Sequence, residues 1–445
     1  MKLLEKYRNH SLLINTAKLS SSNIIMYVLP IIVTPILSRL YTPANFGEWG
    51  IFSSIINIAT IAIFLSLDNA IVKVEEDEVP PILILCLPIG ILLSAVFILF
   101  LIGIDYIGIL KVGEIYAYII YLIAYLVFSL AYNLNNRYAK YTPLAVSNIV
   151  QGGTQALFRI GLVYITIVPT NGLILGTTIA ECITAFILTI IIFPYIKKAN
   201  WEKGTLSYLK RMFIKYRNFP LYDAPANLLA FSALSLPTII LAIYYSKSEI
   251  GSLSIIFQLL LMPMSLIGSA IGKVYYQELC KQPNNIEKIM AVTNSTLKIL
   301  SFISILPLII ICCGGDKVIV FFLGSKWQTA GDIAICLSLW AFPVVLTQPL
   351  LPIFRVQDKQ KTQLYYDLLY FILGIGSLLL CCNYSQSLYT TLCCFALACS
   401  ISKFALFRKI LSITECKILE NKKAILIWCL GLLILTIRVY LIWER

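Results

Sequence analysis

Long apolar runs separated by short polar connections recur along the whole chain. Each run spans about 20 residues, the length that an α-helix needs to cross the hydrocarbon layer of a membrane. Lipid offers backbone groups no hydrogen bonds, so only helices or barrel strands can span it, and the runs lack the two-residue alternation of barrel strands. The pattern therefore predicts an all-α polytopic membrane protein. The thirteen segments cover approximately residues 20–40, 49–72, 80–103, 115–135, 143–168, 172–196, 219–245, 249–275, 296–313, 329–354, 363–382, 388–407 and 424–443.

The connections between the runs are short, which favours antiparallel helix neighbours. The longest polar stretch, 197–218, is strongly basic and is too short for a soluble domain. It leaves six helices before it and six or seven after it. We therefore expect four parts: an N-terminal six-helix lobe, a basic cytoplasmic linker, a C-terminal six-helix lobe, and a basic loop with a thirteenth helix. Their ranges are 1–196, 197–218, 219–407 and 408–445.

The openings of the two halves resemble each other faintly. Leu29–Pro30 corresponds to Leu236–Pro237, and Gly47 corresponds to Gly251. Two repeated six-helix lobes around a central cavity are a transporter architecture. Chance similarity is the alternative explanation of so short a match.

Composition and charge agree with a membrane protein and set its orientation. The chain is 59% hydrophobic and 13% charged, whereas soluble domains are usually about 45–50% apolar. With the N-terminus inside, 27 of the 35 Lys and Arg residues fall in or beside inside connections. Lys and Arg concentrate in cytoplasmic loops, so this predicts a cytoplasmic N-terminus and an uncleaved first span. The same rule accounts for the net charge of +13 and argues against nucleic-acid binding.

The sequence contains no pattern that predicts a metal-binding or cofactor-binding site. The 13 cysteines lie mostly in or beside apolar runs, and the single histidine is His10. No cluster of Cys and His has the spacing of a metal site. We interpret the cysteines as small apolar packing residues and expect no metal, no cofactor and no catalytic residues.

The fifth segment carries a polar stripe on an otherwise apolar helix. At 100° per residue, Asn148, Gln151, Gln155 and Arg159 fall on one face. A charge near the bilayer centre costs at least about 2.5–3.5 kcal/mol on insertion scales. The stripe is therefore expected to face protein or water rather than lipid.

Three other segments carry polar groups that predict a shared hydrated cavity. The second has Ser53, Asn57, Thr60 and Asp68 on one expected face, the sixth has Glu181 among threonines, and the seventh has Asp223 and Asn227 one turn apart. A guanidinium is always charged and matches phosphate oxygens bidentately, so Arg159 is the candidate for an anionic head group. The alternatives are that Arg159 forms a structural ion pair with Glu181 or Asp68, and that Asp68 and Asp223 lie at the membrane boundary.

The chain resembles the bacterial polysaccharide exporters and O-antigen flippases (the Wzx type) of the multidrug/oligosaccharidyl-lipid/polysaccharide exporter superfamily. The resemblance covers roughly residues 15 to 407, and it rests on packing and turn patterns. The stretches that carry it are "LSRLYTPANFGEWGIFSSI", "RNFPLYDAPANLLAFSALSLPTIIL", "FQLLLMPMSLIGSAIGKVYYQEL" and "FFLGSKWQTAGDIAICLSLWAFPVVLTQPLLPIFRVQDKQK".

This resemblance implies a flippase of the bacterial inner membrane. It would move an undecaprenyl-pyrophosphate-linked oligosaccharide by alternating access, for lipopolysaccharide or other surface polysaccharide synthesis. Its partners would be membrane lipids, a polysaccharide polymerase and a chain-length regulator. The resemblance also implies a cationic cavity, which fits Arg159. Proteins of this family usually have twelve helices, so the thirteenth segment is a departure from the family pattern.

Two other functions compete with the flippase. An exporter of small cationic drugs shares the fold and would use acidic cavity residues such as Glu181 and Asp68. A membrane enzyme, either a polysaccharide polymerase or a glycosyltransferase, would need a large outer loop or a D-x-D site, and neither occurs. The acidic run 74–78 is interpreted instead as a solvated helix end.

Overall fold

The computed structural model describes residues 21–416, except 23, 27, 166–170, 199–205, 283, 311–313, 315 and 385–386, together with residue 437. Within these ranges all regular secondary structure is helical, as the apolar pattern predicts. Among the described residues, eight helices are long and apolar enough to cross a membrane, and they coincide with eight predicted segments. The predicted thirteenth segment, 424–443, lies outside the described residues. The protein is therefore an all-α, multi-pass membrane protein.

The predicted segments and the helices agree closely. An apolar helix over Ile24–Leu40 precedes the labelled ones. The longer labelled helices are α2 (Pro43–Ala62), α3 (Val79–Ile107), α4 (Ile115–Arg137), α5 (Tyr141–Gly161), α6 (Gly172–Lys198), α8 (Ala224–Tyr244), α9 (Lys247–Lys281), α10 (Ile286–Ile310), α12 (Gln328–Thr347), α14 (Gln360–Tyr384) and α15 (Leu388–Thr414). The shorter ones are α7 (Leu206–Lys215), α11 (Asp316–Leu323) and α13 (Pro352–Val356).

The chain forms two compact units. Unit 1 comprises residues 1–41 and 48–235, and unit 2 comprises 42–47 and 236–445. Helices α2 and α8 each contribute to both units, because the divisions fall inside them. The expected lobes 1–196 and 219–407, on either side of the linker 197–218, stay predictions.

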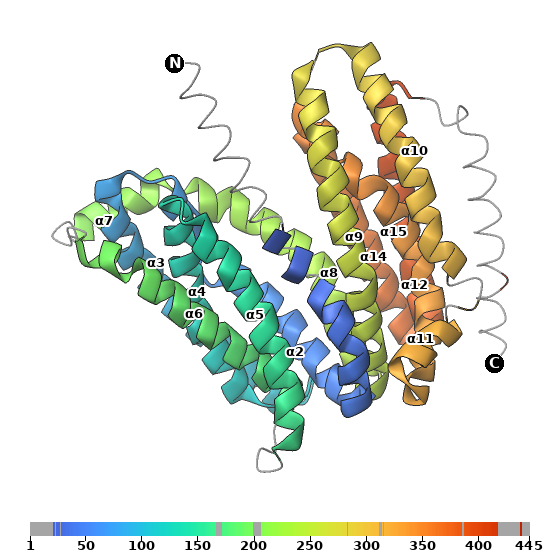
Figure 1. Ribbon diagram of the computed structural model, residues 1–445, viewed down its shortest axis with the longest axis horizontal. Helices are drawn as coiled ribbons and strands as arrows, with labels where there is room; N and C mark the ends of the chain where they lie inside the picture. The colour runs from blue at the N-terminus through green and yellow to red at the C-terminus, as the bar shows by residue number, and fades with distance from the viewer. Residues whose placement is uncertain are drawn as a thin grey trace. The chain divides into compact units, whose positions relative to one another are not determined.

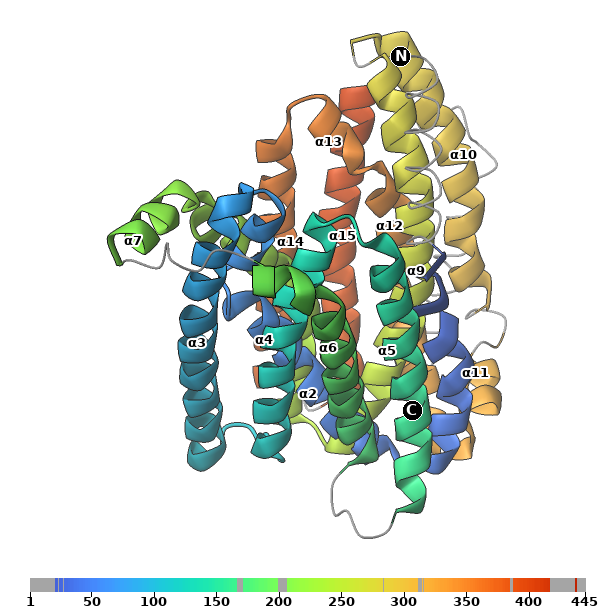
Figure 2. The ribbon, with the colours of Figure 1, turned by 60° about the vertical axis from the view of Figure 1, so that its left-hand side comes forward.

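Unit 1 is built around α4, α5 and α6. Helix α6 packs along both α4 and α5, and α3 packs on α4 (Figure 1). The short helix α7 contacts α3 and runs across its end (Figure 2). Arg137, in the last turn of α4, donates to the backbone oxygens of Ile71 (3.1 Å) and Val74 and pairs with Glu76 at 3.2 Å. These contacts fasten the connection between α2 and α3 to the end of α4.

The second predicted segment is broken rather than continuous. Helix α2 ends at Ala62, and the chain continues through Leu65 and Ser66, which have positive φ angles of 49° and 57°, into the 3₁₀ helix η1 (Leu67–Val72). The break changes the helical phase. The prediction that Asp68 shares one helix face with Asn57 is therefore wrong, because the two residues lie on different elements.

Unit 2 has α12 as its most buried long helix. It packs against α9, α10 and α15, and α15 packs in turn on α14 (Figure 2). Trp340 of α12 lies edge-on to Phe257, with ring centroids 5.6 Å apart, and its Nε1 donates to the hydroxyl of Tyr370 at 2.9 Å. Burying an indole is favourable here because its N–H finds an acceptor.

The start of α2 packs against the start of α9 within unit 2, at the positions that the faint sequence repeat pairs. A Cβ atom on Gly47 would overlap the carbonyl oxygen of Lys247, and a Cβ on Gly251 would overlap that of Pro43. The two contacts are reciprocal. Only residues without a Cβ allow two helix backbones to approach so closely.

The same two helix starts are capped alike. Thr42 and Asn45 exchange side-chain and backbone hydrogen bonds of 3.1 and 3.3 Å, and Ser246 and Glu249 exchange bonds of 3.0 and 3.3 Å. Each pair is three residues apart, so each satisfies backbone N–H groups that the first helical turn leaves open. These shared details favour a genuine repeat over chance similarity.

An ion pair joins α14 and α15 in unit 2. The Nζ atom of Lys403 lies 3.9 Å from Oδ1 of Asp367 and 4.3 Å from the centre of the Tyr370 ring. The side chain of Lys403 is 14% exposed and that of Asp367 is 36% exposed. Lys403 lies within the predicted segment 388–407, and the structure places it inside α15, which continues to Thr414.

We expect Asp367→Asn to lower the free energy of unfolding by about 1–3 kcal/mol, because it leaves the Lys403 ammonium mostly buried without its counter-charge. The loss should be below that of a fully buried pair, since Asp367 is partly exposed. Thermal unfolding of the purified protein in detergent measures it. The double variant with Lys403→Met serves as the control and should recover part of the loss. Equal stability of Asp367→Asn and the wild type would contradict this prediction.

Candidate functional site

Unit 1 contains a partly enclosed cavity of about 440 Å³. Its size is within the range of small-molecule binding sites. The residues that line it come from the first apolar helix, η1, α4, α5 and α6: Met26, Asp68, Asn69, Tyr121, Tyr125, Phe128, Ser129, Tyr132, Asn133, Asn148, Gln151 and Glu181. Four of them, Asp68, Asn148, Gln151 and Glu181, are predicted site residues that the fold brings together from three elements.

Glu181 is the most deeply buried of the acidic groups in the cavity wall, with only 2% of the residue exposed. Its Oε2 accepts a hydrogen bond from Nε2 of Gln151 at 2.6 Å and one from the hydroxyl of Tyr121 at 3.5 Å. Its Oε1 has no hydrogen-bond partner among the described residues. A buried carboxylate oxygen without a donor is costly, and a donor would reach this atom only after the side chain or the cavity wall shifts.

Asp68 provides a second acidic group in the same cavity. Its Oδ2 accepts hydrogen bonds from the hydroxyl of Ser129 at 2.5 Å and from the amide of Asn133 at 3.3 Å, both on α4. The location of Asp68 in η1, beyond the end of α2, brings it to this part of α4. Asp68 is buried within the protein, and its location at the membrane boundary stays a prediction.

Helix α4 contributes a row of aromatic rings that the sequence analysis missed. Neighbouring rings of Tyr121, Tyr125, Phe128 and Tyr132 lie 6.5, 6.0 and 5.6 Å apart between centroids. Their spacing of four, three and four residues puts them on one helix face, and Ser129 and Asn133 lie beside them. This helical spacing was visible in the fourth segment and could have identified the face.

Arg159 lies apart from the residues that line the cavity. It is in the last turn of α5, which ends at Gly161, rather than in the interior of a helix that continues to 168. The arginine is 5% exposed. A cation in the last turn of a helix is favoured by the helix dipole, which lowers the cost of burying it.

The guanidinium of Arg159 is held by neutral groups. Its Nη2 donates to Oγ1 of Thr177 at 2.8 Å, and its Cζ lies 4.7 Å from the centre of the Trp49 ring. The Trp49 indole donates to the same threonine oxygen at 3.3 Å, and the backbone oxygen of Arg159 accepts from the Tyr41 hydroxyl at 2.6 Å. Gly176 allows this packing, because a Cβ there would lie 2.8 Å from the backbone nitrogen of Arg159.

No carboxylate in the described ranges lies within 4.0 Å of the Arg159 guanidinium, and its Nε has no hydrogen-bond partner there. The structural ion pair with Glu181 or Asp68 that the sequence left open is therefore not formed in this structure. A buried charge without a counter-charge is costly, and an ionisable residue of this kind in a membrane protein is a candidate functional residue.

The remaining predicted site residues do not line the cavity. Gln155 is half-buried on α5, and Asn57 is exposed on α2. Asp223 is exposed in the π-helical turn η5 (Phe219–Asp223). Asn227 is half-buried and donates to Oγ of Ser66 at 3.3 Å, so it supports the turn before η1. The four stripe residues of the fifth segment therefore have different surroundings. Asn148 and Gln151 line the cavity, Gln155 is half-buried outside it, and Arg159 packs on Trp49 and Thr177.

The acidic run 74–78 is not simply a solvated helix end. Glu78 is buried, pairs with Lys215 of α7 and accepts from the Tyr216 hydroxyl at 2.6 Å. The hydrogen bond to Glu78 raises the pKa of Lys215 to about 12, and burial raises the pKa of Tyr216. These contacts attach α7 to the start of α3 and lie outside the cavity.

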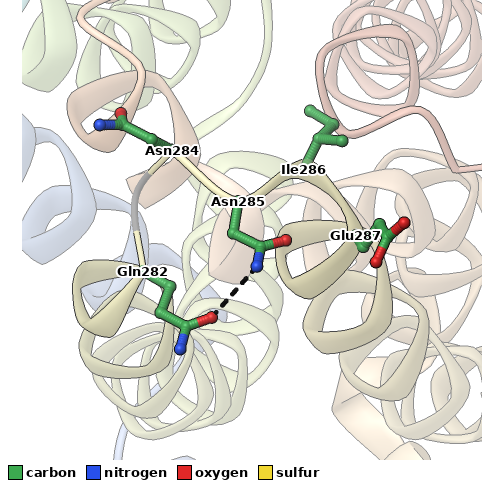
Figure 3. Close-up of a pocket in the computed structure, with 5 residues that line it drawn as sticks. All are labelled: Gln282, Asn284, Asn285, Ile286 and Glu287. Atoms are coloured by element: carbon green, nitrogen blue, oxygen red, sulfur yellow. Dashed lines mark hydrogen bonds between the residues drawn. The ribbon is translucent and has the colours of Figure 1, made fainter.

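A second hollow, of about 630 Å³, lies on the surface of unit 2 where α9 turns into α10 (Figure 3). Its polar groups serve the turn itself. Asn285 donates to Oε1 of Gln282 at 3.4 Å, and its Oδ1 accepts from the backbone N–H of Lys288 at 3.1 Å, as the N-terminal cap of α10. The turn and the helix cap therefore account for the side-chain amides of Gln282 and Asn285 in this hollow.

The described part of the chain contains no group of three or more His, Cys, Asp or Glu side chains arranged to hold a metal ion. The chemistry of the unit 1 cavity is therefore that of its carboxylates, amides, hydroxyls and aromatic rings.

Comparison with solved structures shows that the fold is similar to that of MOP superfamily transporters. A multidrug resistance MATE family transporter of the MOP superfamily, in an inward-facing conformation, matches with a TM-score of 0.66 at 12% identity, covering 88% of this chain and 96% of that one. The lipid II flippase MurJ matches with a TM-score of 0.64 at 12% identity, covering 94% and 99%. A MOP superfamily transporter from Pyrococcus furiosus matches with a TM-score of 0.58 at 15% identity, covering 90% and 95%.

Sequence comparison identifies the family. No curated protein sequence matches this chain. The profile of the family described as "Polysaccharide biosynthesis protein" matches residues 36–332, which is more than half of the chain. The chain therefore belongs to the polysaccharide biosynthesis protein family, and it has the fold of MOP superfamily transporters.

Proposed function

We propose that this protein is a flippase that moves an undecaprenyl-pyrophosphate-linked oligosaccharide across the bacterial inner membrane for surface polysaccharide synthesis. The observation that carries the proposal is Arg159, a buried guanidinium that has no carboxylate partner among the described residues. A pyrophosphate would supply the missing negative charge. The family of the chain and the name of one structural relative, a lipid II flippase, support a lipid-linked substrate.

The physical task of such a protein is to carry a charged, hydroxylated head group through a low-dielectric layer while the polyprenyl tail stays in lipid. Polar groups fixed in the protein replace the water that the head group loses. Arg159 would attract the pyrophosphate, and its Nε, which is buried without a partner here, would be a donor beyond the bond to Thr177 once a conformational change exposes it. Alternating access of the two halves would expose the site to each side in turn.

The direction of transport follows from the proposed role in surface polysaccharide synthesis. The substrate would enter from the cytoplasmic leaflet and leave in the outer one. A polysaccharide polymerase and a chain-length regulator would act on the product at the outer face.

One observation favours a second candidate, an exporter of small organic cations. The cavity in unit 1 is lined by Asp68, Glu181 and four aromatic rings, and its described lining includes no Lys or Arg. Carboxylates and aromatic faces both attract cations. A membrane enzyme is disfavoured by the transporter fold.

Genetic complementation separates the two candidates. We expect the gene to restore surface polysaccharide in a strain that lacks its own flippase, without raising resistance to cationic dyes or drugs in a strain that lacks its drug exporters. A gene that raises drug resistance and leaves surface polysaccharide unrestored would overturn the flippase in favour of the exporter. Immunoblots of membrane fractions ensure that the protein is present in both strains.

A further inference from the structure

We propose that the cavity of unit 1 is a sugar-binding subsite, in which the aromatic row of α4 and the carboxylates of Asp68 and Glu181 recognise pyranose rings of the transported head group. The inference deepens the proposed function and rests on it. It gives the cavity and Arg159 different tasks: the cavity holds the sugar, and the arginine attracts the pyrophosphate.

The aromatic row has the chemistry and the length to bind sugar rings. The faces of aromatic rings carry negative potential and attract the polarised C–H groups of a pyranose face. From Tyr121 to Tyr132 the row extends about 16 Å along the axis of α4, since an α-helix rises about 1.5 Å per residue. That length exceeds one sugar ring. The rings are half-buried, so part of each remains accessible from the cavity.

Acceptors and donors for hydroxyl groups lie at both ends of the row. Near Tyr121, Glu181 has one oxygen bonded to Gln151 and Tyr121, while the other, Oε1, is buried without a hydrogen-bond partner among the described residues. Near Tyr132, Asp68 is held by Ser129 and Asn133. Sugars present many O–H donors, and a buried carboxylate oxygen that lacks a donor is where such a group gains most.

The same charges make the cavity a poor place for the pyrophosphate. Two carboxylates without a lysine or arginine in the described lining would repel it. Arg159 is eight residues beyond Gln151 on α5, which is about 12 Å along the helix axis. A head group whose sugar occupies the cavity could therefore reach the arginine with its charged end only by extending along α5.

The lining also favours a sugar over an organic cation. Five neutral polar side chains, Asn69, Ser129, Asn133, Asn148 and Gln151, line the cavity together with the carboxylates. Ser129, Asn133, Asn148 and Gln151 already bond to Asp68, Ser22 and Glu181, and a lipophilic cation would make no use of the donors and acceptors that these side chains have left. Hydroxyl groups of a sugar can satisfy both the amides and the carboxylates.

Binding to the full-length protein in lipid nanodiscs tests the inference. The probes are undecaprenyl pyrophosphate without sugar, the same lipid carrying glucose, galactose or N-acetylglucosamine, and the cation tetraphenylphosphonium. The variants are Tyr125→Leu, which removes a ring from the middle of the row, and Tyr125→Phe, which keeps it. Tyr116→Leu is the matched control, because Tyr116 is an exposed tyrosine of the same helix and does not line the cavity.

We expect at least one sugar-bearing lipid to bind the wild type more tightly than the sugar-free lipid. Tyr125→Leu should reduce that advantage about 3- to 10-fold, the size of an aromatic contact, and leave binding of the sugar-free lipid unchanged. Tyr125→Phe and Tyr116→Leu should keep the advantage.

Two contrary results have different meanings. If all four lipids bind equally to the wild type, or if Tyr125→Leu leaves the advantage intact, the sugar subsite is wrong while the flippase proposal stands. If none of the lipids binds and tetraphenylphosphonium binds in a manner that Tyr125→Leu weakens, the cavity serves cations and both proposals fail.

Discussion

Arg159→Ala is expected to reduce surface polysaccharide about 10- to 100-fold at normal protein abundance. Hydrogen bonds to a charged group contribute about 1.5–3 kcal/mol each, and 1.4 kcal/mol corresponds to a factor of ten. The wild-type guanidinium has no carboxylate counter-charge in the described part of the chain, so its removal leaves no buried acid unpaired. The measurement is polysaccharide export in a strain deleted for its own flippase, with protein amounts checked by immunoblot.

The conservative and double variants show whether Arg159 has a structural role instead. Arg159→Lys keeps the charge but loses the planar fork, so we expect partial export. The double change of Arg159→Ala with Glu181→Gln should be no better than the single change, because the two side chains form no ion pair. A single variant that loses protein and a double variant that regains it would show that the arginine is a structural partner of Glu181.

The second large effect is expected at the reciprocal glycine contact of unit 2. Gly251→Val should lower the free energy of unfolding by about 1–3 kcal/mol, as overpacking in a close-packed interior does, because even its Cβ would overlap the carbonyl oxygen of Pro43. Gly47→Val should act similarly through the carbonyl oxygen of Lys247. Thermal unfolding of the purified protein, followed by intrinsic fluorescence, measures both.

Non-additivity is the specific signature of this contact. Either valine must separate the same two helix starts, so the double variant should lose clearly less stability than the sum of the two single losses. Gly376→Ala is the control, since a Cβ at that position on α14 meets no atom within 4 Å. Additive losses, or a stable Gly251→Val protein, would show that the two helices do not depend on this approach.

The helices were predictable because lipid imposes one rule on every span. Backbone groups must be paired within the segment, so apolar length alone identifies the long helices, while the orientation that the charge asymmetry indicates stays a prediction. What the apolar pattern could not reveal is the break after Ala62, where Leu65 and Ser66 adopt positive φ angles that the surrounding structure stabilises. No Pro or Gly marks that turn in the sequence. The helical-wheel prediction for Asp68 therefore failed.

The candidate site was predictable in its acidic and amide groups but not in its arrangement. Glu181, Gln151, Asn148 and Asp68 were identified because polar groups are rare and costly in apolar helices, and the structure brings them to one cavity. Arg159 was identified by the same argument, yet it packs on Trp49 and Thr177, because helix packing rather than spacing decides what a side chain meets. The aromatic row was missed because tyrosine and phenylalanine are common in membrane helices and do not stand out as polar residues do.

The most direct test of the account is transport by the purified protein in liposomes. The substrates are undecaprenyl pyrophosphate bearing a labelled oligosaccharide and, in parallel, a fluorescent lipophilic cation, and the readout is the amount of each that reaches the opposite leaflet or the lumen. The account predicts that the wild type moves the lipid-linked oligosaccharide, that Arg159→Ala does not, and that neither moves the cation. Transport of the cation by the wild type, with the lipid-linked oligosaccharide left in its original leaflet, would contradict the account.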